Sequence, residues 1–282
     1  MKLKLPILLL LLVAQLLLSK PSSAAQTLRV GIVPQQSAAA LAKVWVPVLS
    51  YLQERTGLIL QFETAKDIPT FEQRLAAGEY DIAYMNPYHY IVFHAAPGYS
   101  AFAREKDTKL QGLIVVHKNS PIKSVAELEG KTMAFPAPGS FAATILPLTH
   151  LKSLGIRVTP NFASSHDSVY LGVARGFFPA GGGIARTFDN IPPEIRNELR
   201  ILWKTPQYTP HALAAHPRLP APTVRALQSA LMGMDADPRG KELLVPLNFK
   251  GFEQGRDADW NDIRKLGIRA LENVGQDIAG GR

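Results

Sequence analysis

The chain has 282 residues, a formal net charge of +8, 46% hydrophobic residues and no cysteine. This length suits one large or two smaller domains with ample residues for a core. The lack of cysteine excludes a disulfide framework and a lipid-modified cysteine, and the dispersed charges argue against nucleic-acid binding.

The first 25 residues have the pattern of a secretory signal peptide. Two lysines precede an apolar run at residues 5–18, and small residues at 22–25 form a cleavage zone. The run is short for a membrane span of about 20 residues, which favours cleavage over retention as an anchor. We therefore expect residues 1–25 to be removed from an exported protein.

Short strands and helices alternate along the rest of the chain. In chain order, the predicted strands are 28–33, 58–64, 81–84, 110–116, 131–135 and 199–205. The predicted helices are 41–57, 68–77, one starting at 87, 124–130, 140–154, 166–176, 223–234 and 257–274. Pro47 should kink or divide the first helix. Repeated strand–helix units imply parallel sheets joined by right-handed crossovers.

The turn at residues 135–144, FPAPGSFAAT, is the strongest local signal for a binding site. A strand ends at Phe135, and Ser140 stands where the N-cap of the next helix belongs. The backbone N–H groups of Phe141, Ala142 and Ala143 are then accessible, and a helix start of this kind binds anions. The alternative is an ordinary serine cap.

A second signal is the aromatic stretch YDIAYMNPYHY, residues 80–90. Tyr84 and Asn86 fall at the carboxyl end of a predicted strand, where open α/β sheets bind ligands. Their hydroxyl and amide groups supply donors without burying a charge. Tyrosines here can also be packing residues, and we prefer that interpretation for Tyr90.

The segment SSHDSV, residues 164–169, is a third candidate. His166 could donate to an oxyanion, whereas Asp167 could simply cap the helix that follows. The histidines lack metal-ligand spacing, and the chain has no nucleotide-binding loop and no GxSxG elbow. We therefore predict no metal, no cofactor and no enzymatic activity.

Four segments in register resemble a known family. They are YDIAYMNPYHY, ELEGKTMAFPAPGSFAATILP, SHDSVYLGVARG and YTPHALAAHPRLPA. In this order they are similar to the phosphate, phosphite and phosphonate solute-binding proteins of ABC transporters, a branch of the periplasmic binding protein superfamily. The similarity covers roughly residues 28–273.

The resemblance implies a two-lobed α/β fold of type II, with a mostly parallel sheet in each lobe and two hinge crossings. Lobe one would comprise residues 26–112 and 206–282, and lobe two residues 113–205. The crossings would lie near Gly112 and near Thr205 to Thr209.

The resemblance also implies which residues bind the ligand between the lobes. The family's tyrosine segment maps to Tyr84 with Asn86 and Tyr88 close by, its oxyanion grip to Ser140, Phe141 and Ala142, and its carboxylate to Asp167. His166, and Gln35 in the turn after the first strand, complete the predicted set.

Two departures from the family pattern bear on the ligand. Ser140-Phe141-Ala142 stands where phosphonate binders commonly have Ser-Thr-Ser, so two hydroxyls are lost while the N–H groups remain. Pro179-Ala180-Gly181 stands where the family has an acidic segment, which makes an aminophosphonate less suited to this site.

The resemblance therefore predicts a monomeric periplasmic protein that binds a small oxyanion and delivers it to an ABC permease in the membrane. Phosphate, phosphite or a phosphonate is the leading ligand class. The alternatives are a different small anion, a sensory adaptor for a membrane kinase, and an enzyme on the same scaffold.

Overall fold

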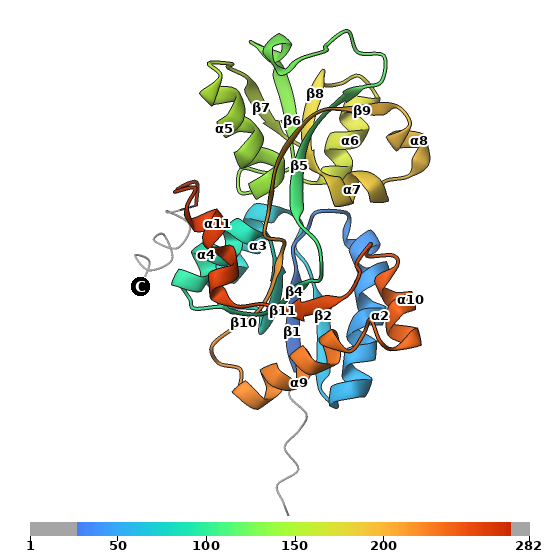
Figure 1. Cartoon of the computed structure of the whole chain (residues 1–282), viewed down its shortest axis with the longest axis vertical. Helices are drawn as coiled ribbons and strands as arrows, with labels where there is room; N and C mark the ends of the chain where they lie inside the picture. Colours follow the sequence, from blue (N-terminus) through green and yellow to red (C-terminus); the bar gives the residue numbers. More distant parts are fainter. Residues whose placement is uncertain (1–26, 272–282) are drawn as a thin grey trace, which may run out of the picture.

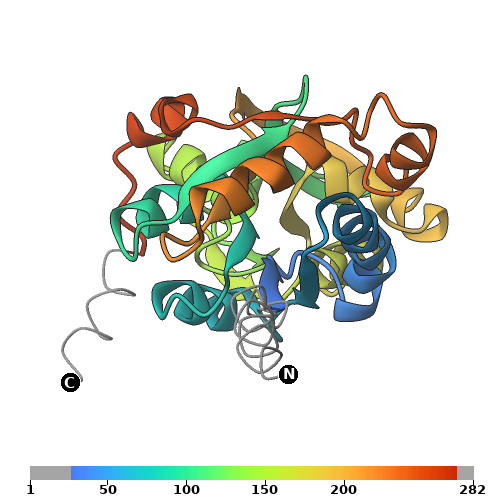
Figure 2. The same ribbon diagram turned by 90° about the horizontal axis from the view of Figure 1, so that it is seen from below.

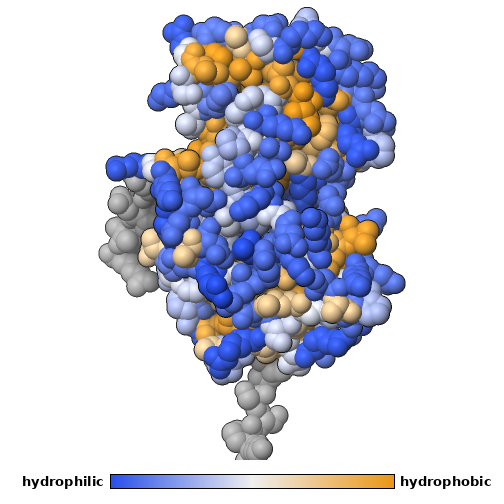
Figure 3. All heavy atoms as spheres, in the orientation of Figure 1, coloured by the Kyte–Doolittle hydropathy of each residue, from blue (hydrophilic) through white to orange (hydrophobic). Residues whose placement is uncertain are grey.

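Two separate β-sheets organise the chain (Figure 1). This computed structural model describes residues 27–271, so the predicted signal peptide lies outside the described residues. We call the six-stranded sheet with its helices lobe one, and the five-stranded sheet with its helices lobe two. The space-filling view narrows between the two lobes (Figure 3).

Lobe one contains a mixed sheet with the strand order β11-β4-β10-β3-β1-β2. Its strands are β1 (Thr27–Ile32), β2 (Ile59–Glu63), β3 (Ile82–Met85), β4 (Ser100–Glu105), β10 (Ala212–Ala215) and β11 (Phe252–Gln254). β1 pairs in parallel with β2 and β3, whereas β10 and β4 are antiparallel to their neighbours. The expected mostly parallel sheet is thus a mixed one, because strands that the sequence pattern did not reveal fill the antiparallel half.

Helices cover both faces of this sheet. They are α2 (Ala38–Thr56), α3 (Ile68–Ala76), α4 (Pro87–Ala95), α9 (Ala221–Met232), α10 (Pro238–Leu244) and α11 (Asn261–Arg264). α2 and α10 lie on one side, with α3, α4 and α11 on the other (Figure 1). α9 packs beside α2 at the end of lobe one farthest from lobe two (Figure 2).

The longest helix, α2, follows its sequence signals. The Ser37 side chain accepts a hydrogen bond from the Ala40 N–H at its start, and Gly57 ends it in the left-handed conformation. Its buried face includes Leu41, Trp45 and Val48. Pro47 lies inside this helix without dividing it.

Lobe two contains the second mixed sheet, with the strand order β7-β6-β8-β5-β9. Its strands are β5 (Leu110–His117), β6 (Thr132–Phe135), β7 (Thr159–Phe162), β8 (Ala180–Ile184) and β9 (Leu199–Tyr208). Its helices are α5 (Leu146–Ser153), α6 (His166–Ala174), α7 (Ala185–Asn190) and α8 (Pro193–Arg196), with short turns η1 (Val125–Leu128) and η2 (Phe141–Ile145).

Both faces of this sheet are buried, which explains the continuous apolar run in β5. Ile114 and Val116 point into one hydrophobic core, and Leu113 and Val115 into another. Side chains alternate across a strand, so a strand covered on both faces needs apolar residues at every position.

One antiparallel ribbon, β5 paired with β9, runs between the lobes. The Gly112 N–H donates to the Thr205 hydroxyl at 2.9 Å, and the Gln111 side chain donates to the Thr205 carbonyl at 2.9 Å. The predicted crossings near Gly112 and Thr205 fall in this ribbon. The residue boundaries of the lobes stay a prediction.

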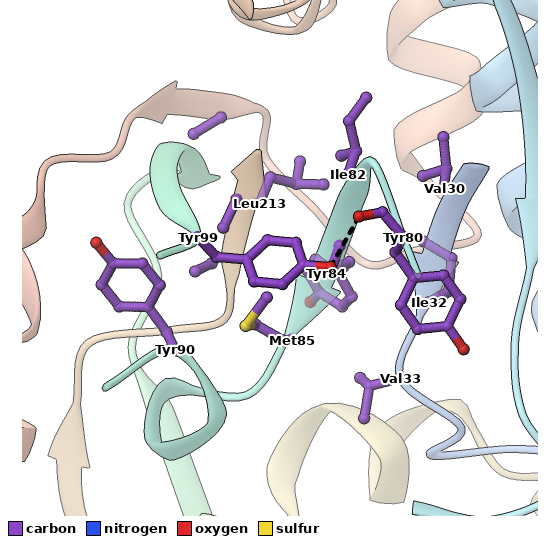
Figure 4. Close-up of a cluster of buried hydrophobic side chains, with 14 of the residues drawn as sticks. Val30, Ile32, Val33, Tyr80, Ile82, Tyr84, Met85, Tyr90, Tyr99 and Leu213 are labelled. Atoms are coloured by element: carbon purple, nitrogen blue, oxygen red, sulfur yellow. Dashed lines mark hydrogen bonds between the residues drawn. The ribbon is translucent and has the colours of Figure 1, made fainter. Parts of the chain in front are cut away.

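The aromatic stretch at residues 80–90 is mostly core. Ile82 and Ala83 are buried in β3, and Tyr90 is fully buried with its hydroxyl donating to Asp257 at 2.9 Å. In Figure 4 the Tyr99 side chain points toward Tyr80, and its hydroxyl donates a hydrogen bond to the Tyr80 carbonyl at 2.7 Å. The structure therefore places Tyr90 among the packing residues.

The helix predicted at 257–274 is wrong in its described part. The chain forms a single 3₁₀ turn, η3 (Asp257–Trp260), and then α11, which ends at Arg264. Gly267 has a φ of 59°, a left-handed conformation that stops a right-handed helix. Residues 272–274 of the predicted helix lie outside the described residues.

Candidate functional site

A small cavity with both polar and apolar lining residues lies between the two lobes. It brings together six residues that the sequence predicted for ligand binding, namely Gln35, Asn86, Ser140, Phe141, Ala142 and His166. The other lining residues are Val33, Ile68, Leu110, Ala143, Ile184 and His211. The lining therefore contains donors and neutral polar groups, and none of these twelve residues is acidic.

The carboxyl ends of the parallel strands in both lobes meet at this cavity. Gln35 follows β1 and Asn86 follows β3 in lobe one, while Ser140 follows β6 and His166 follows β7 in lobe two. This is the edge at which open α/β sheets bind ligands. The His166 N–H donates to the Gln35 carbonyl at 2.9 Å, so backbones of the two lobes are in direct contact here.

The helix start at Ser140 begins with a π turn, η2, before it continues as α5. The first bonds run from the N–H groups of Thr144 and Ile145 to the Ser140 carbonyl, at 2.9 and 3.1 Å. The N–H groups of Phe141, Ala142 and Ala143 precede these bonds and have no acceptor within the helix. π turns occur often at functional sites.

The Ser140 side chain does not cap this helix, in contrast to the ordinary-cap alternative. Ser140 is 3% exposed, lines the cavity and makes no side-chain cap hydrogen bond. Its hydroxyl is therefore free of the structural role that most helix-start serines have.

Asn86 has two structural roles beside the cavity. Its side-chain oxygen accepts from the His89 N–H at 2.8 Å and caps α4, where Pro87 takes the first helical position. Its amide nitrogen donates to the Gly139 carbonyl of lobe two at 3.2 Å. Asn86 thus links the two lobes at the cavity wall.

Tyr84 does not line this cavity. Its hydroxyl donates to Glu105 Oε1 at 2.5 Å and accepts from Arg186 Nη1 at 2.6 Å. Arg186 also forms an ion pair with Glu105. Burial raises the pKa of Tyr84 well above its ordinary value, so the group is a neutral phenol.

Gln35 connects this charged cluster to the cavity. Its side-chain oxygen accepts from Arg186 Nη2 at 3.0 Å, and its amide nitrogen lies 3.0 Å from His211 Nε2. The His211 ring stacks on Tyr84 with centroids 5.0 Å apart. Gln35, which bonds to Arg186, and His211, which stacks on Tyr84, both line the cavity.

Both cavity histidines are neutral. Burial and the nearby Arg186 lower the pKa of His166 to about 3, and burial lowers the pKa of His211 well below its ordinary value. His166 Nδ1 lies 3.1 Å from the Thr187 hydroxyl, which fixes the ring.

The remaining two predicted residues lie outside the cavity lining. The Tyr88 hydroxyl accepts from the Leu271 N–H at 3.0 Å, so it bonds to the C-terminal segment. Asp167 is half-buried in the first turn of α6, where Ser165 is the N-cap in its place. Burial raises the pKa of Asp167.

Glu105, Arg186 and His211 are not among the residues that the sequence predicts for the site. His211 stands in the segment YTPHALAAHPRLPA, but a lone histidine has no spacing pattern that would indicate a binding role. Glu105 ends the strand β4, and Arg186 follows the glycine-rich strand β8; neither strand is among those predicted from the sequence.

Residues 27–271 contain neither a metal-ligand cluster nor a membrane-spanning helix. The described part of the chain holds no cluster of three or more residues suited to a metal ion. Within the same residues, no helix has the length and apolar character needed to cross a bilayer.

Two α/β lobes with a cavity at the carboxyl ends of their parallel strands form the architecture expected of a two-lobed binding protein. Residues 30–260 match the family described as "ABC transporter, phosphonate, periplasmic substrate-binding protein". The chain therefore belongs to this family of substrate-binding proteins.

Individual relatives are distant in sequence. The phosphate-import protein PhnD of Mycolicibacterium smegmatis is 22% identical over 286 residues, covering 89% of this chain and 83% of that protein. PhnD1 of Prochlorococcus marinus, solved with methylphosphonate, superposes with a TM-score of 0.79 at 20% identity, covering 86% of this chain and 97% of that one. A binding component of a phosphonate transporter from Pseudomonas aeruginosa gives 0.79 at 20% identity, with 86% of both chains covered. These structures show the shared fold.

Proposed function

We propose that this protein binds a small phosphorus oxyanion between its lobes in the periplasm and delivers it, as a monomer and without chemical change, to an ABC permease. The observation that supports this most is the Ser140 helix start, whose hydroxyl and N–H groups line a cavity free of acidic side chains. Helix starts bind anions because their N–H groups and dipole favour negative charge.

The size of the cavity supports a mechanism of lobe closure. The cavity has a volume of about 10 Å³, which is room for about one water molecule. A tetrahedral oxyanion is larger, so the lobes must separate to admit it and then close on it. Closure removes water, and each polar contact to the ligand becomes stronger as a result.

The lining also favours particular ligands in the family's range. Phosphate, phosphite and methylphosphonate present oxygen acceptors to the donors of the cavity. An ammonium group would find no carboxylate among the lining residues, so aminophosphonates suit the site less well.

A thermal-shift screen of the mature protein tests this proposal. Phosphate, phosphite, methylphosphonate, sulfate, chloride and small carboxylates would be compared at equal ionic strength. A ligand at 100 times its Kd stabilises the folded protein by about 2.7 kcal/mol, which raises Tm by roughly 5–10 °C at this chain length. A shift with carboxylates or sulfate alone would contradict the phosphorus-oxyanion proposal.

A further inference from the structure

His211 is a buried histidine whose two ring nitrogens have very different surroundings. It lies between β9 and β10, is 1% exposed and lines the cavity. Nε2 lies 3.0 Å from Gln35 Nε2. Nδ1 is buried and has no hydrogen-bond partner within residues 27–271.

The contacts of Arg186 fix which way the Gln35 amide points. A guanidinium has only N–H donors, so the Gln35 atom that faces Arg186 at 3.0 Å must be the oxygen. The NH₂ group of Gln35 therefore faces His211 and donates to its Nε2. The Arg186–Glu105 pair holds the guanidinium in place for this contact.

This contact determines the tautomer of His211. Burial lowers the pKa of the ring well below its ordinary value, so the ring is neutral and carries a single hydrogen. Nε2 accepts a hydrogen bond and must be unprotonated, which places the hydrogen on Nδ1. A buried donor without a partner destabilises a protein, so an unmet donor on a residue that lines a binding cavity points to a ligand.

We propose, on the basis of the proposed function, that the His211 Nδ1–H donates a hydrogen bond to the bound ligand and that Glu105, Arg186 and Gln35 hold the ring in this donor state. The ligand must then present an acceptor oxygen to His211, on the lobe-one side of the cavity. A ligand that places an ammonium group there meets an N–H donor instead of an acceptor and is rejected. His211 is thus a specificity-determining residue for phosphorus oxyanions that lack an amino group.

The tautomer can be measured without any ligand. Long-range ¹H–¹⁵N correlation spectra of the histidine-labelled mature protein distinguish Nδ1–H, Nε2–H and imidazolium rings, and the His211→Asn variant assigns the signal. We expect the Nδ1–H pattern at pH 7. An Nε2–H or imidazolium pattern for His211 would overturn the proposal.

Two variants of similar polarity test the ligand contact. His211→Asn places an amide nitrogen near the position of Nδ1, whereas His211→Gln places one near the position of Nε2. Methylphosphonate affinity, measured by calorimetry, should stay within a few fold of wild type in the asparagine variant and fall at least about tenfold in the glutamine variant. Circular dichroism checks that both variants fold, and equal affinity in all three proteins would overturn the contact.

A third experiment compares the affinities of the wild-type protein for methylphosphonate and for 2-aminoethylphosphonate. We expect methylphosphonate to bind at least about tenfold more tightly, and tighter binding of the amino compound would contradict the proposal. If no phosphorus oxyanion binds at all, the proposed function fails together with the ligand contact, whereas the ring-nitrogen spectra separately show whether the donor tautomer exists.

Discussion

The guanidinium of Arg186 in lobe two pairs with the carboxylate of Glu105 in lobe one, and the two side chains are only 17% and 3% exposed. The Tyr84 hydroxyl bonds to both groups. A buried ion pair stabilises a structure only when it is complete, because each charge has lost its water. Because this pair joins the two lobes, it favours the arrangement of the lobes in which it forms.

Replacement of Glu105 by glutamine should open the protein. Removal of one partner of a buried pair costs about 3–5 kcal/mol, but lobe separation returns Arg186 to water and avoids most of that loss. We expect the ligand-free Glu105→Gln variant to have a larger radius of gyration in small-angle scattering and at least about tenfold weaker ligand binding.

Tyr84→Phe is the matched control for this variant. It keeps the ion pair and removes only the hydroxyl that bonds to Glu105 and Arg186. The free energy of unfolding should fall by about 1–3 kcal/mol in urea titration, with the radius of gyration unchanged. A radius equal to wild type in both variants would show that the Arg186–Glu105 pair does not hold the lobes together.

The fold could be predicted from the sequence to the extent that its elements have local signals. β1, α2 and α3 carry clear periodicity and end signals, such as Asp67 capping α3 and Gly57 ending α2. β10 has the sequence ALAA, which lacks the branched and aromatic residues typical of strands. It is a strand because β3 and β4 pair with it from both sides, and local sequence does not contain that information.

The residues of the candidate site could likewise be predicted from the sequence only in part. Ser140 and Asn86 stand at strand ends that the sequence revealed, so their convergence on one cavity could be anticipated from sheet geometry. Tyr84 lies two residues before Asn86, near the end of β3, but its side chain bonds to Glu105 and Arg186. These partners come from distant segments, and a single sequence does not show which side chain meets which.

Removal of the Ser140 hydroxyl should weaken ligand binding and leave stability unchanged. The Ser140 side chain makes no cap hydrogen bond, so Ser140→Ala removes nothing on which α5 depends. We expect oxyanion affinity to fall by about 1–2 kcal/mol in calorimetry. Ser37→Ala is the opposite case, because Ser37 caps α2 through the Ala40 N–H and lies outside the cavity lining.

The Ser37→Ala control should lose about 1 kcal/mol of stability and keep its affinity. If Ser140→Ala lost stability while binding the ligand as tightly as wild type, Ser140 would have only a structural role.

Acidification should destabilise the protein through His166. Its pKa is about 3 in the folded protein, against about 6.5 in an unfolded chain. Below pH 6.5 the unfolded chain binds a proton that the folded protein does not, so stability is lost as pH falls from 6.5 toward 3. The loss from this one group is about 2 kcal/mol at pH 5.

The His166→Gln variant isolates that effect. Its unfolding free energy, measured by urea titration from pH 7 to 5, should fall less steeply than that of wild type. Asp167 acts in the opposite direction, because burial raises its pKa, so the difference between the two proteins is the relevant quantity. Identical pH dependence in both proteins would contradict a neutral, buried His166.

Gly139, in the turn before Ser140, lies against lobe one. A Cβ atom at this position would lie 1.9 Å from Glu72 Oε1 and 3.3 Å from Leu271 Cδ1. The Glu72 carboxylate cannot turn away freely, because it is buried and lies 2.8 Å from His89 Nε2. The Gly139 carbonyl also accepts the hydrogen bond from Asn86.

Gly139→Ala should therefore block closure of the lobes. Since each lobe keeps its own core, the circular dichroism spectrum should match wild type while ligand affinity falls at least about tenfold and the radius of gyration increases. Gly233→Ala is the matched control, because a Cβ there would lie 3.5 Å from the Ser229 carbonyl, an ordinary contact, at the end of α9. The control should bind as wild type does. Wild-type affinity in Gly139→Ala as well would mean that ligand binding does not need the close approach of Gly139 to Glu72.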